Sequence, residues 1–342
     1  MTGRAAPLRK IVILGAGAIG THTGAAWAGA AVRGGASISL IGRAATLAGF
    51  RETALRLTGG PDGVVPELTC GIDPAMLAGA DLVILAMKAT GLHRAVGDIR
   101  THADPGTPLI SLLNGLAPVR ELAAALPGHK VIAGMVPYNV VWRGPAHLHR
   151  SSAGDLALAR SAETEALANL VAESGLSPVL HDDLAPIQYG KLLLNLINPI
   201  NALAGIPLHA MLSDRGYRRI YAATLREALM VYRAAGISWQ KVGPISPRLA
   251  VHLLGTPDAL FNPTLLKVQK IDPNSMTSMA SDVMAGRPTE IEAITGEILH
   301  IAGRAGIRAP VNQALADEIR LAERAGTSPR HSAAALAKLV LP

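Results

Sequence analysis

The chain has 342 residues, enough for two domains that each bury a core, and 49% of them are apolar although only 3% are aromatic. Ala, Leu, Val and Ile must therefore fill the core, and the lack of aromatic residues argues against a base-stacking single-strand nucleic-acid binder. The formal net charge is +7, but the basic residues are scattered, and the densest group, Arg215, Arg218 and Arg219, is typical of a solvated helix face.

A single cysteine, Cys70, excludes an intramolecular disulfide and a cysteine-rich zinc site, and it favours a reducing, cytoplasmic location. No apolar stretch reaches the roughly 20 residues that cross a bilayer, and the N-terminus lacks the pattern of a signal peptide. His147 and His149 alternate without accompanying carboxylates, so we expect no metal site.

The first half of the chain alternates short apolar strands with helical segments. Continuous apolar strands separated by helices are typical of a parallel sheet that is covered on both faces. We therefore predict an α/β fold with a Rossmann-type, doubly wound parallel sheet over residues 1–182. Its strands are expected at 10–15, 37–42, 81–88, 108–115 and 130–136, with an edge strand at 154–159.

From residue 183 on, the pattern is helical and shows no strand alternation, so residues 183–342 are predicted to form an all-helical C-terminal domain. Long helices are expected at 184–205, 217–236 and 289–306. In the first of these, Pro199 has no N–H for the carbonyl four residues back and should kink the helix. The tail after Ala325 is expected to be loosely attached.

A glycine motif, G-x-G-x-x-G, follows the first strand and opens a helix. Its first glycine permits the tight turn, its second lets the backbone approach a pyrophosphate, and its third permits close helix–strand packing. The helix N-terminus then offers free N–H groups and a partial positive charge to the phosphates. We interpret the motif as a dinucleotide cradle rather than a plain turn, formed by Gly15, Ala16, Gly17, Ala18, Ile19 and Gly20.

The end of the second strand indicates which dinucleotide binds. An NAD enzyme usually carries Asp or Glu about 20 residues after the motif to bind the ribose 2′-OH. This chain has Arg43 there and no acidic residue from Ile38 to Phe50. Because an arginine would pair with a 2′-phosphate, we predict NADP(H) as the cofactor, with Arg43 as the residue that selects it.

Lys88 and Asn114 stand at the carboxyl ends of two further predicted strands. Ligands of open α/β sheets bind outside these ends, so both residues are expected to face the nicotinamide. Position alone is equally compatible with a solvent-facing strand end at Lys88 and a plain Asn-Gly turn at Asn114.

In the helix expected at 184–205, Lys191, Asn195 and Asn198 fall at i, i+4 and i+7, within one narrow stripe. The residues between them are apolar, which is typical of a buried helix. Buried polar groups need partners, so the stripe is either a satisfied internal network or the wall of a polar ligand site. Asn201 lies off the stripe and is left out of the predicted site.

The stretch around Ser278 and Glu290 is interpreted as helix, break at 286–288, and helix. Thr289 and Glu292 have the spacing of a capping box for the second helix. Glu290 would lie in its first turn, where the helix dipole favours an ionised carboxylate. On this pattern alone an ordinary N-terminal acidic residue explains Glu290 better, and nothing in the spacing brings Ser278 to it.

Together these segments resemble the ketopantoate reductase (2-dehydropantoate 2-reductase) family. The matching pieces are "GAGAIG", "LIGR", "AMKAT", "LLNGL", "GKLLLNLINPINAL" and "SMASDVMAGRPTEIEAITGEI", and the last is the most specific. The resemblance spans residues 10 to 298. It implies a Rossmann domain followed by a helical domain, and NADPH-dependent reduction of the ketone of a branched 2-oxo acid, a step of pantothenate and coenzyme A biosynthesis.

By position, the resemblance makes Lys191 the catalytic lysine and Glu290 the active-site glutamate. It makes Ser278 and Asn195 substrate-binding residues, and it places Lys88 and Asn114 beside the nicotinamide. Asn198 departs from the pattern of many members, because it follows Asn195 by three residues rather than four. We still include Asn198 and Asn114 among the residues expected to bind substrate.

In the implied reaction, Lys191 stabilises the charge that develops on the C2 oxygen and donates the proton, while Glu290 binds a substrate hydroxyl. The expected partner is a small anionic 2-oxo acid, with neither nucleic acid nor membrane, and the sequence is compatible with a homodimer. Two alternatives stay open: a reductase of the same fold for another 2-oxo acid, and a non-catalytic NADP-binding regulator, which would need neither Lys191 nor Glu290.

Overall fold

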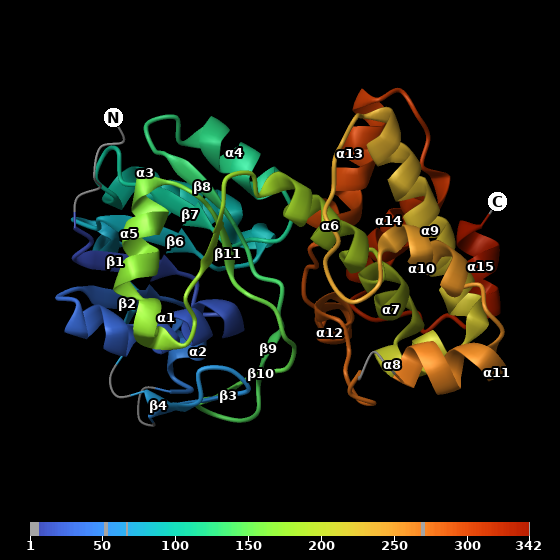
Figure 1. The fold of residues 1–342 in the computed structure, drawn as a ribbon, viewed down its shortest axis with the longest axis horizontal. Helices are drawn as coiled ribbons and strands as arrows, with labels where there is room; N and C mark the ends of the chain where they lie inside the picture. Colours follow the sequence, from blue (N-terminus) through green and yellow to red (C-terminus); the bar gives the residue numbers. More distant parts are fainter. Residues whose placement is uncertain (1–6, 51–53, 66–67, 268–270, 342) are drawn as a thin grey trace. The chain divides into compact units, whose positions relative to one another are not determined.

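The computed structural model describes residues 7–50, 54–65, 68–267 and 271–341. Its contacts divide the chain into two compact units, one up to Leu184 and one from Ala185 on (Figure 1). No helix within the described ranges is long and apolar enough to cross a membrane.

The first unit is built on an eight-stranded sheet with the order β12-β11-β8-β7-β6-β1-β2-β5. All neighbouring strands are parallel except β8 and β11. The predicted α/β fold with its mainly parallel sheet is confirmed. Its strands are β1 (Lys10–Leu14), β2 (Ser37–Ile41), β5 (Thr69–Gly71), β6 (Leu82–Leu85), β7 (Leu109–Ser111), β8 (Val131–Met135), β11 (Ala157–Ala159) and β12 (Val179–His181).

Strand β1 shows how both faces of this sheet are buried. Ile11 and Ile13 belong to the apolar cluster that contains Trp27 of α1 (Ala18–Arg33), whereas Val12 and Leu14 belong to the cluster on the other face. Successive side chains of a strand point to opposite faces, so an unbroken apolar run requires helices on both. The remaining helices of the unit are α2 (Ala44–Leu47), α3 (Leu92–His102), α4 (Ala117–Ala125) and α5 (Ala162–Leu170), with short 3₁₀ turns at Pro74–Leu77, Ala89–Gly91 and Ala172–Ser174.

A second, four-stranded sheet in this unit was not predicted. Its order is β4-β3-β10-β9, and it packs against α1. Each strand has only three or four residues, too few for an alternating pattern to be recognised. His147 and His149 both lie on β10, and each has a ring nitrogen 2.9 Å from the Thr58 hydroxyl. The strands are β3 (Leu55–Thr58), β4 (Gly63–Val65), β9 (Val140–Trp142) and β10 (His147–Arg150).

The regular elements described in the second unit are all helices, and the longest, α9 (Arg215–Ala234), packs against α8, α10, α13, α14 and α15. At the end of α9, Gly236 has a φ of +65° and its N–H reaches the carbonyl of Arg233, as a glycine C-cap requires. The other helices are α6 (Ala185–Asn195), α7 (Asn198–Ala204), α8 (Leu208–Ser213), α10 (Pro247–Leu253), α11 (Asp258–Phe261), α12 (Ser278–Met284), α13 (Glu297–Arg304), α14 (Pro310–Ala325) and α15 (Ala333–Val340), with π-helical segments at Asn262–Leu266 and Glu292–Gly296.

The expectation of a loosely attached tail after Ala325 is wrong. Helix α15 buries Leu336 and Val340 in the core of the helical unit. The segment before it is also fixed, because the Ser328 hydroxyl donates to the carbonyl of Ala202 and the Tyr217 hydroxyl donates to the carbonyl of His331. These contacts join residues more than a hundred positions apart, so no local pattern could indicate them.

The solvated face expected for Arg215, Arg218 and Arg219 is wrong for Arg218. Its side chain is fully buried, with the guanidinium 4.0 Å from the centre of the Phe261 ring and 2.8 Å from the Asp258 carboxylate. It also donates to the carbonyls of Leu212, Leu254 and Thr256. A buried guanidinium is tolerated only when its donors are satisfied in this way.

Candidate functional site

The carboxyl ends of four adjacent strands form one edge of the large sheet. Gly15 follows β1, Arg43 follows β2, and Lys88 and Asn114 lie shortly after β6 and β7. The chain leaves β1 in one direction toward β2 and later continues on the other side with β6, so this edge contains the topological switch point of the sheet. The four residue positions predicted from the sequence therefore lie along the edge where such sheets bind dinucleotides.

Two glycines of the motif are required by close backbone packing. Gly15 has a φ of +124°, and a Cβ on it would lie 2.5 Å from the backbone nitrogen of Met87. A Cβ on Gly20 would collide with the carbonyl oxygen of Gly15. The tight turn and the close seating of α1 on β1 thus leave no room for a side chain at either position.

Gly17 differs from these two, because a Cβ on it would meet nothing nearer than the Ala86 carbonyl oxygen at 4.0 Å. Its backbone is extended, with a φ of −71°, and it is the N-cap of α1 without a capping side chain. The first turn of α1 also contains no acidic residue. The absence of a side chain here leaves open the approach to the helix N-terminus, which fits the pyrophosphate of a dinucleotide.

Arg43 lies next to this cradle. The preceding residue, Gly42, is so close to Ala16 of the motif that a Cβ on Gly42 would collide with the Ala16 methyl group. Arg43 itself is exposed and is the N-cap residue of α2. Its side chain is therefore available to a ligand that extends from the cradle toward β2.

In the helical unit, Lys191 lies on α6 and interacts electrostatically with Glu290. Burial lowers the pKa of the Lys191 ammonium to about 8, although the negative charge of Glu290 pulls this pKa upward. The neighbouring Gly190 lets this part of α6 lie directly against the backbone of Gln240, because a Cβ there would collide with the Gln240 carbonyl. A lysine with a pKa near neutral pH is suited to proton transfer.

The single helix expected at 184–205 is two helices. Helix α6 ends at Asn195 and α7 begins at Asn198, with a turn at 196–197. The interruption fits the kink predicted from Pro199, whose ring cannot continue the α-helical hydrogen bonds. Because the helix is interrupted between them, the spacing of Asn195 and Asn198 no longer guarantees that their side chains share one face with Lys191.

Asn201, which sequence reasoning left out, connects two parts of the predicted site. It is fully buried on α7, its amide nitrogen donates to the carbonyl of Ile206 at 2.8 Å, and its amide oxygen accepts from the N–H of Thr277 at 2.9 Å. Thr277 is the N-cap of α12, and Ser278 is the first residue of that helix. Asn201 thus ties the start of the Ser278 helix to α7, a contact across 76 residues that only the fold reveals.

The capping box predicted for Thr289 and Glu292 is wrong. The Thr289 N–H donates to Glu323, and the Glu292 carboxylate pairs instead with Arg320. Glu290 directly precedes the helix, and its carbonyl accepts from the N–H of Ile294. The helix opens with the π-helical segment Glu292–Gly296, and such wide turns are frequent at functional sites.

Among the residues that the structure describes, no three His, Cys, Asp or Glu side chains are grouped so that they could hold a metal ion.

A Rossmann-type unit with a glycine turn after β1, followed by a helical unit, is typical of dinucleotide-dependent oxidoreductases. A family model described as "Ketopantoate reductase PanE/ApbA" matches residues 11–163, and one described as "Ketopantoate reductase PanE/ApbA C terminal" matches residues 183–323. Because these matches cover most of the sequence, the chain belongs to the ketopantoate reductase family.

Individual relatives are distant but similar over nearly their full length. The chain is 25% identical over 331 residues to a 2-dehydropantoate 2-reductase of Halobacterium salinarum, covering 93% of this chain and 100% of the relative. A ketopantoate reductase structure from Ralstonia eutropha JMP134 superposes with a TM-score of 0.78 at 26% identity, covering 93% of this chain and 99% of that one. A D-mandelate dehydrogenase structure with NADH and anilino(oxo)acetate shares the fold, with a TM-score of 0.75 at 21% identity over the same shares of the two chains.

The different surroundings of the motif glycines lead to a first prediction. Gly17→Ala should leave the urea unfolding midpoint unchanged and weaken NADH and NADPH binding by roughly tenfold or more, because its methyl group would occupy the space of the pyrophosphate. Gly20→Ala should lower the unfolding midpoint, since its methyl group has no room. Gly29→Ala, further along α1, is the control: a Cβ there would meet only the end of the Arg33 side chain, at 3.6 Å. It should leave dinucleotide binding unchanged and raise the unfolding midpoint slightly, because alanine favours the helix over glycine. Undiminished dinucleotide binding by Gly17→Ala in a fluorescence titration would refute the cradle.

Proposed function

We propose that this protein is an NADP-dependent 2-dehydropantoate 2-reductase, which reduces the C2 ketone of ketopantoate to the alcohol of pantoate. The observation that carries the proposal is the Lys191 ammonium with its pKa lowered to about 8 beside Glu290. A regulator that only bound a dinucleotide would have no need of this pair. Residues up to 182 would bind the cofactor, and the helical part from 183 on would supply the catalytic residues.

NADP(H) is proposed as the cofactor because of Arg43 and the residues around it. Arg43 is exposed, follows β2, and has no acidic residue between Ile38 and Phe50 to repel a 2′-phosphate. Its guanidinium can bind a phosphate with two parallel N–H donors. Gly15–Gly20 would hold the pyrophosphate at the N-terminus of α1, and Lys88 and Asn114 would lie toward the nicotinamide.

The proposed catalytic roles follow from charge. The bound nicotinamide supplies the hydride that adds to C2. The Lys191 ammonium hydrogen-bonds the carbonyl oxygen, stabilises its developing negative charge, and donates the proton that completes the alcohol. Glu290 accepts a hydrogen bond from the substrate hydroxyl and favours the protonated form of Lys191.

Substrate binding is assigned to neutral polar side chains, which suit an anionic 2-oxo acid because further carboxylates would repel it. These residues are Asn195, Asn198 and Ser278 in the helical unit and Asn114 in the nucleotide unit. Asn201 is added as a positioning residue that holds the N-terminus of the Ser278 helix.

A different 2-oxo acid is the second candidate substrate. This chain shares its fold with a D-mandelate dehydrogenase whose structure contains anilino(oxo)acetate. That ligand is a 2-oxo acid derivative without the branched chain of ketopantoate, so other 2-oxo acids are tested as substrates as well. A panel of 2-oxo acids, assayed by NADPH oxidation, should give the highest kcat/KM with ketopantoate. A higher value with an aryl 2-oxo acid would shift the assignment to that substrate, and no turnover across the panel would favour the regulator.

The lowered pKa of Lys191 predicts the pH dependence of the reduction. Lys191 donates a proton, so kcat/KM should be constant below its pKa and fall as the pH rises through about 8. Lys191→Ala should reduce turnover by roughly 10²–10⁴-fold, abolish this alkaline limb and leave NADPH binding intact. Unchanged turnover, or a variant that keeps the same pH profile, would exclude Lys191 as the proton donor.

The proposed cofactor preference can be tested at Arg43. Arg43→Ala should weaken NADPH binding by roughly tenfold or more, because a charge-assisted pair with the 2′-phosphate is lost, while NADH binding changes little. NADH serves as the internal control, and Arg33→Ala, at the exposed end of α1, is the matched variant. Equal losses for the two dinucleotides would mean that Arg43 does not bind the 2′-phosphate.

Asn201 can be compared with a second fully buried asparagine of the same unit. Asn312 donates to the carbonyl of Thr224 and to Glu227, so Asn201→Ala and Asn312→Ala should each lower the free energy of unfolding by about 1–3 kcal/mol. Only Asn201→Ala should also raise KM for the 2-oxo acid several-fold, with KM for NADPH unchanged. An equal KM effect in Asn312→Ala would reduce Asn201 to a purely structural role.

A further inference from the structure

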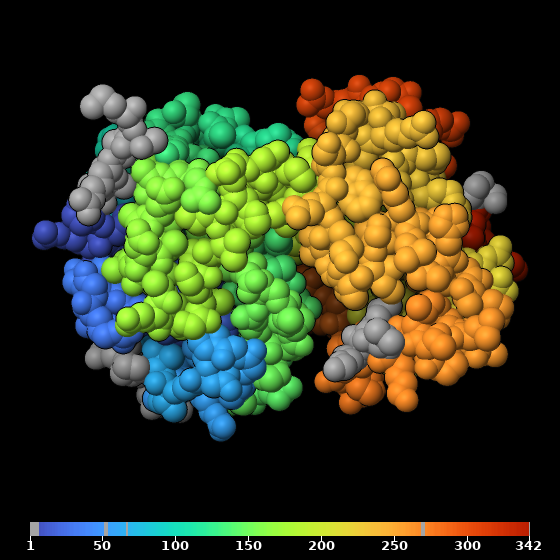
Figure 2. All heavy atoms as spheres, in the orientation of Figure 1, coloured from blue at the N-terminus to red at the C-terminus, as the bar shows by residue number. Residues whose placement is uncertain are grey.

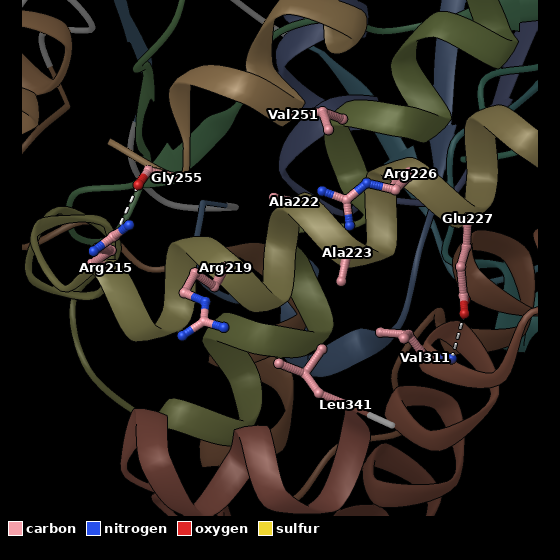
Figure 3. A pocket seen from close by; sticks show the side chains of 10 residues that line it. All are labelled: Arg215, Arg219, Ala222, Ala223, Arg226, Glu227, Val251, Gly255, Val311 and Leu341. Carbon is pink, nitrogen blue, oxygen red and sulfur yellow. Dashed lines mark hydrogen bonds between the residues drawn. The ribbon is translucent and has the colours of Figure 1, made fainter. Parts of the chain in front are cut away.

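Helix α9 carries a stripe of exposed arginines. Arg215, Arg219 and Arg226 are spaced so that Arg219 and Arg226 lie about 40° and 20° around the helix from Arg215. All three line a hollow of about 480 Å³ in the helical unit. Figure 3 shows them along α9, with Leu341, which follows α15, on one side.

The walls of this hollow come from separate elements of the helical unit. Val251 belongs to α10, Gly255 follows it, and Val311 lies in the first turn of α14. Arg215 is held at the rim, because its Nε donates to the carbonyl of Gly255 at 2.8 Å (Figure 3). The golden and orange atoms of α9, α10 and the segment between them lie at the visible surface of the unit (Figure 2). Arg215, Arg219 and Arg226 are themselves exposed, so a solute can reach their guanidinium groups.

The lining carries an excess of positive charge. Its single acidic residue, Glu227, already accepts from the backbone N–H groups of Val311 and Asn312 at 2.9 and 3.0 Å. This carboxylate therefore neutralises the N-terminus of α14 rather than the arginines. Within the described part of the chain, neither Arg219 nor Arg226 has a carboxylate partner at ion-pair distance, whereas Arg218 on the buried face is paired with Asp258.

The size and chemistry of the hollow fit a small ligand. Small-molecule sites have volumes of about 300–1,000 Å³. Arginine forks bind phosphate and carboxylate groups with paired N–H donors, and this hollow offers the guanidinium groups of three arginines. A second hollow of about 660 Å³ continues past Arg226 and Val251 and adds Arg233, Arg248 and Trp239. In it the Arg248 guanidinium lies 5.5 Å from the centre of the Trp239 ring.

We propose that the α9 hollow, lined by Arg215, Arg219 and Arg226, is a binding site for a small polyanion that carries phosphate groups. The adjacent apolar and cationic hollow would accommodate the rest of such a molecule. The site shares no residue with the proposed reductase machinery, and the proposal does not depend on which reaction the protein catalyses.

Isothermal titration of the full-length protein with inorganic pyrophosphate tests the site. Because the cradle at Gly15–Gly20 can also bind pyrophosphate, the informative comparison is between variants that leave the cradle intact. Arg219→Gln/Arg226→Gln should bind pyrophosphate at least tenfold more weakly than the wild type at this site, so that one binding event disappears from the titration. Both side chains are exposed, so the urea unfolding midpoint should be unchanged.

A matched double variant distinguishes binding in the hollow from an effect of the protein's overall charge. Arg304→Gln/Arg324→Gln removes the same two charges from exposed positions on α13 and α14 outside the hollow, and it should bind pyrophosphate as the wild type does. Equal titrations of the wild type and Arg219→Gln/Arg226→Gln would overturn the proposal, since all binding would then lie elsewhere. Equal weakening in the two double variants would also overturn it, because it would show an effect of overall charge.

Discussion

Parallel pairing of β7, β6, β1 and β2 brings their carboxyl ends to one edge of the sheet, and the placement of every residue expected to face the cofactor depends on it. The pairing is possible because each strand is apolar on both faces and is covered by helices on both. Gly15 and Gly20 then allow α1 to begin directly against the end of β1, while Gly17 keeps its N-terminus accessible. Within the single turn between β1 and α1, Gly15 and Gly20 therefore permit close packing of the core, and Gly17 keeps the helix N-terminus accessible.

The helical unit holds charged and amide side chains in an apolar interior, where each polar group needs a hydrogen-bond partner. Arg218, Asn201 and Asn312 are fully buried, and each has hydrogen-bond partners from segments distant in the sequence. Such bonds fix how the helices meet, since each partner lost would leave a buried polar group unsatisfied. Lys191 differs from these residues because burial lowers the pKa of its ammonium group to about 8. The side chain can therefore gain or lose a proton near neutral pH.

Local sequence patterns predicted those features that depend on neighbouring residues. The strands β1, β2 and β8, the glycine turn, the Gly236 cap and the interruption before Pro199 all arise from periodicity or backbone chemistry within a few residues. The errors arise from distant partners: Arg320 takes the Glu292 carboxylate that would complete a capping box, and α15 is held by contacts with α9 and α14. The small sheet escaped notice because its strands are too short to show a pattern. The proposed site residues Ser278 and Glu290 were indicated by family resemblance, not by spacing.

The π-helical segment after Glu290 has a geometric consequence for the direction of that residue. A π turn contains one more residue than an α turn, so it rotates the preceding chain by about 100° relative to the helix that follows. The direction of Glu290 is thereby uncoupled from that of Ile298 and Ile301, which face the core from α13. The wide turn therefore sets the angle between Glu290 and the apolar face of α13.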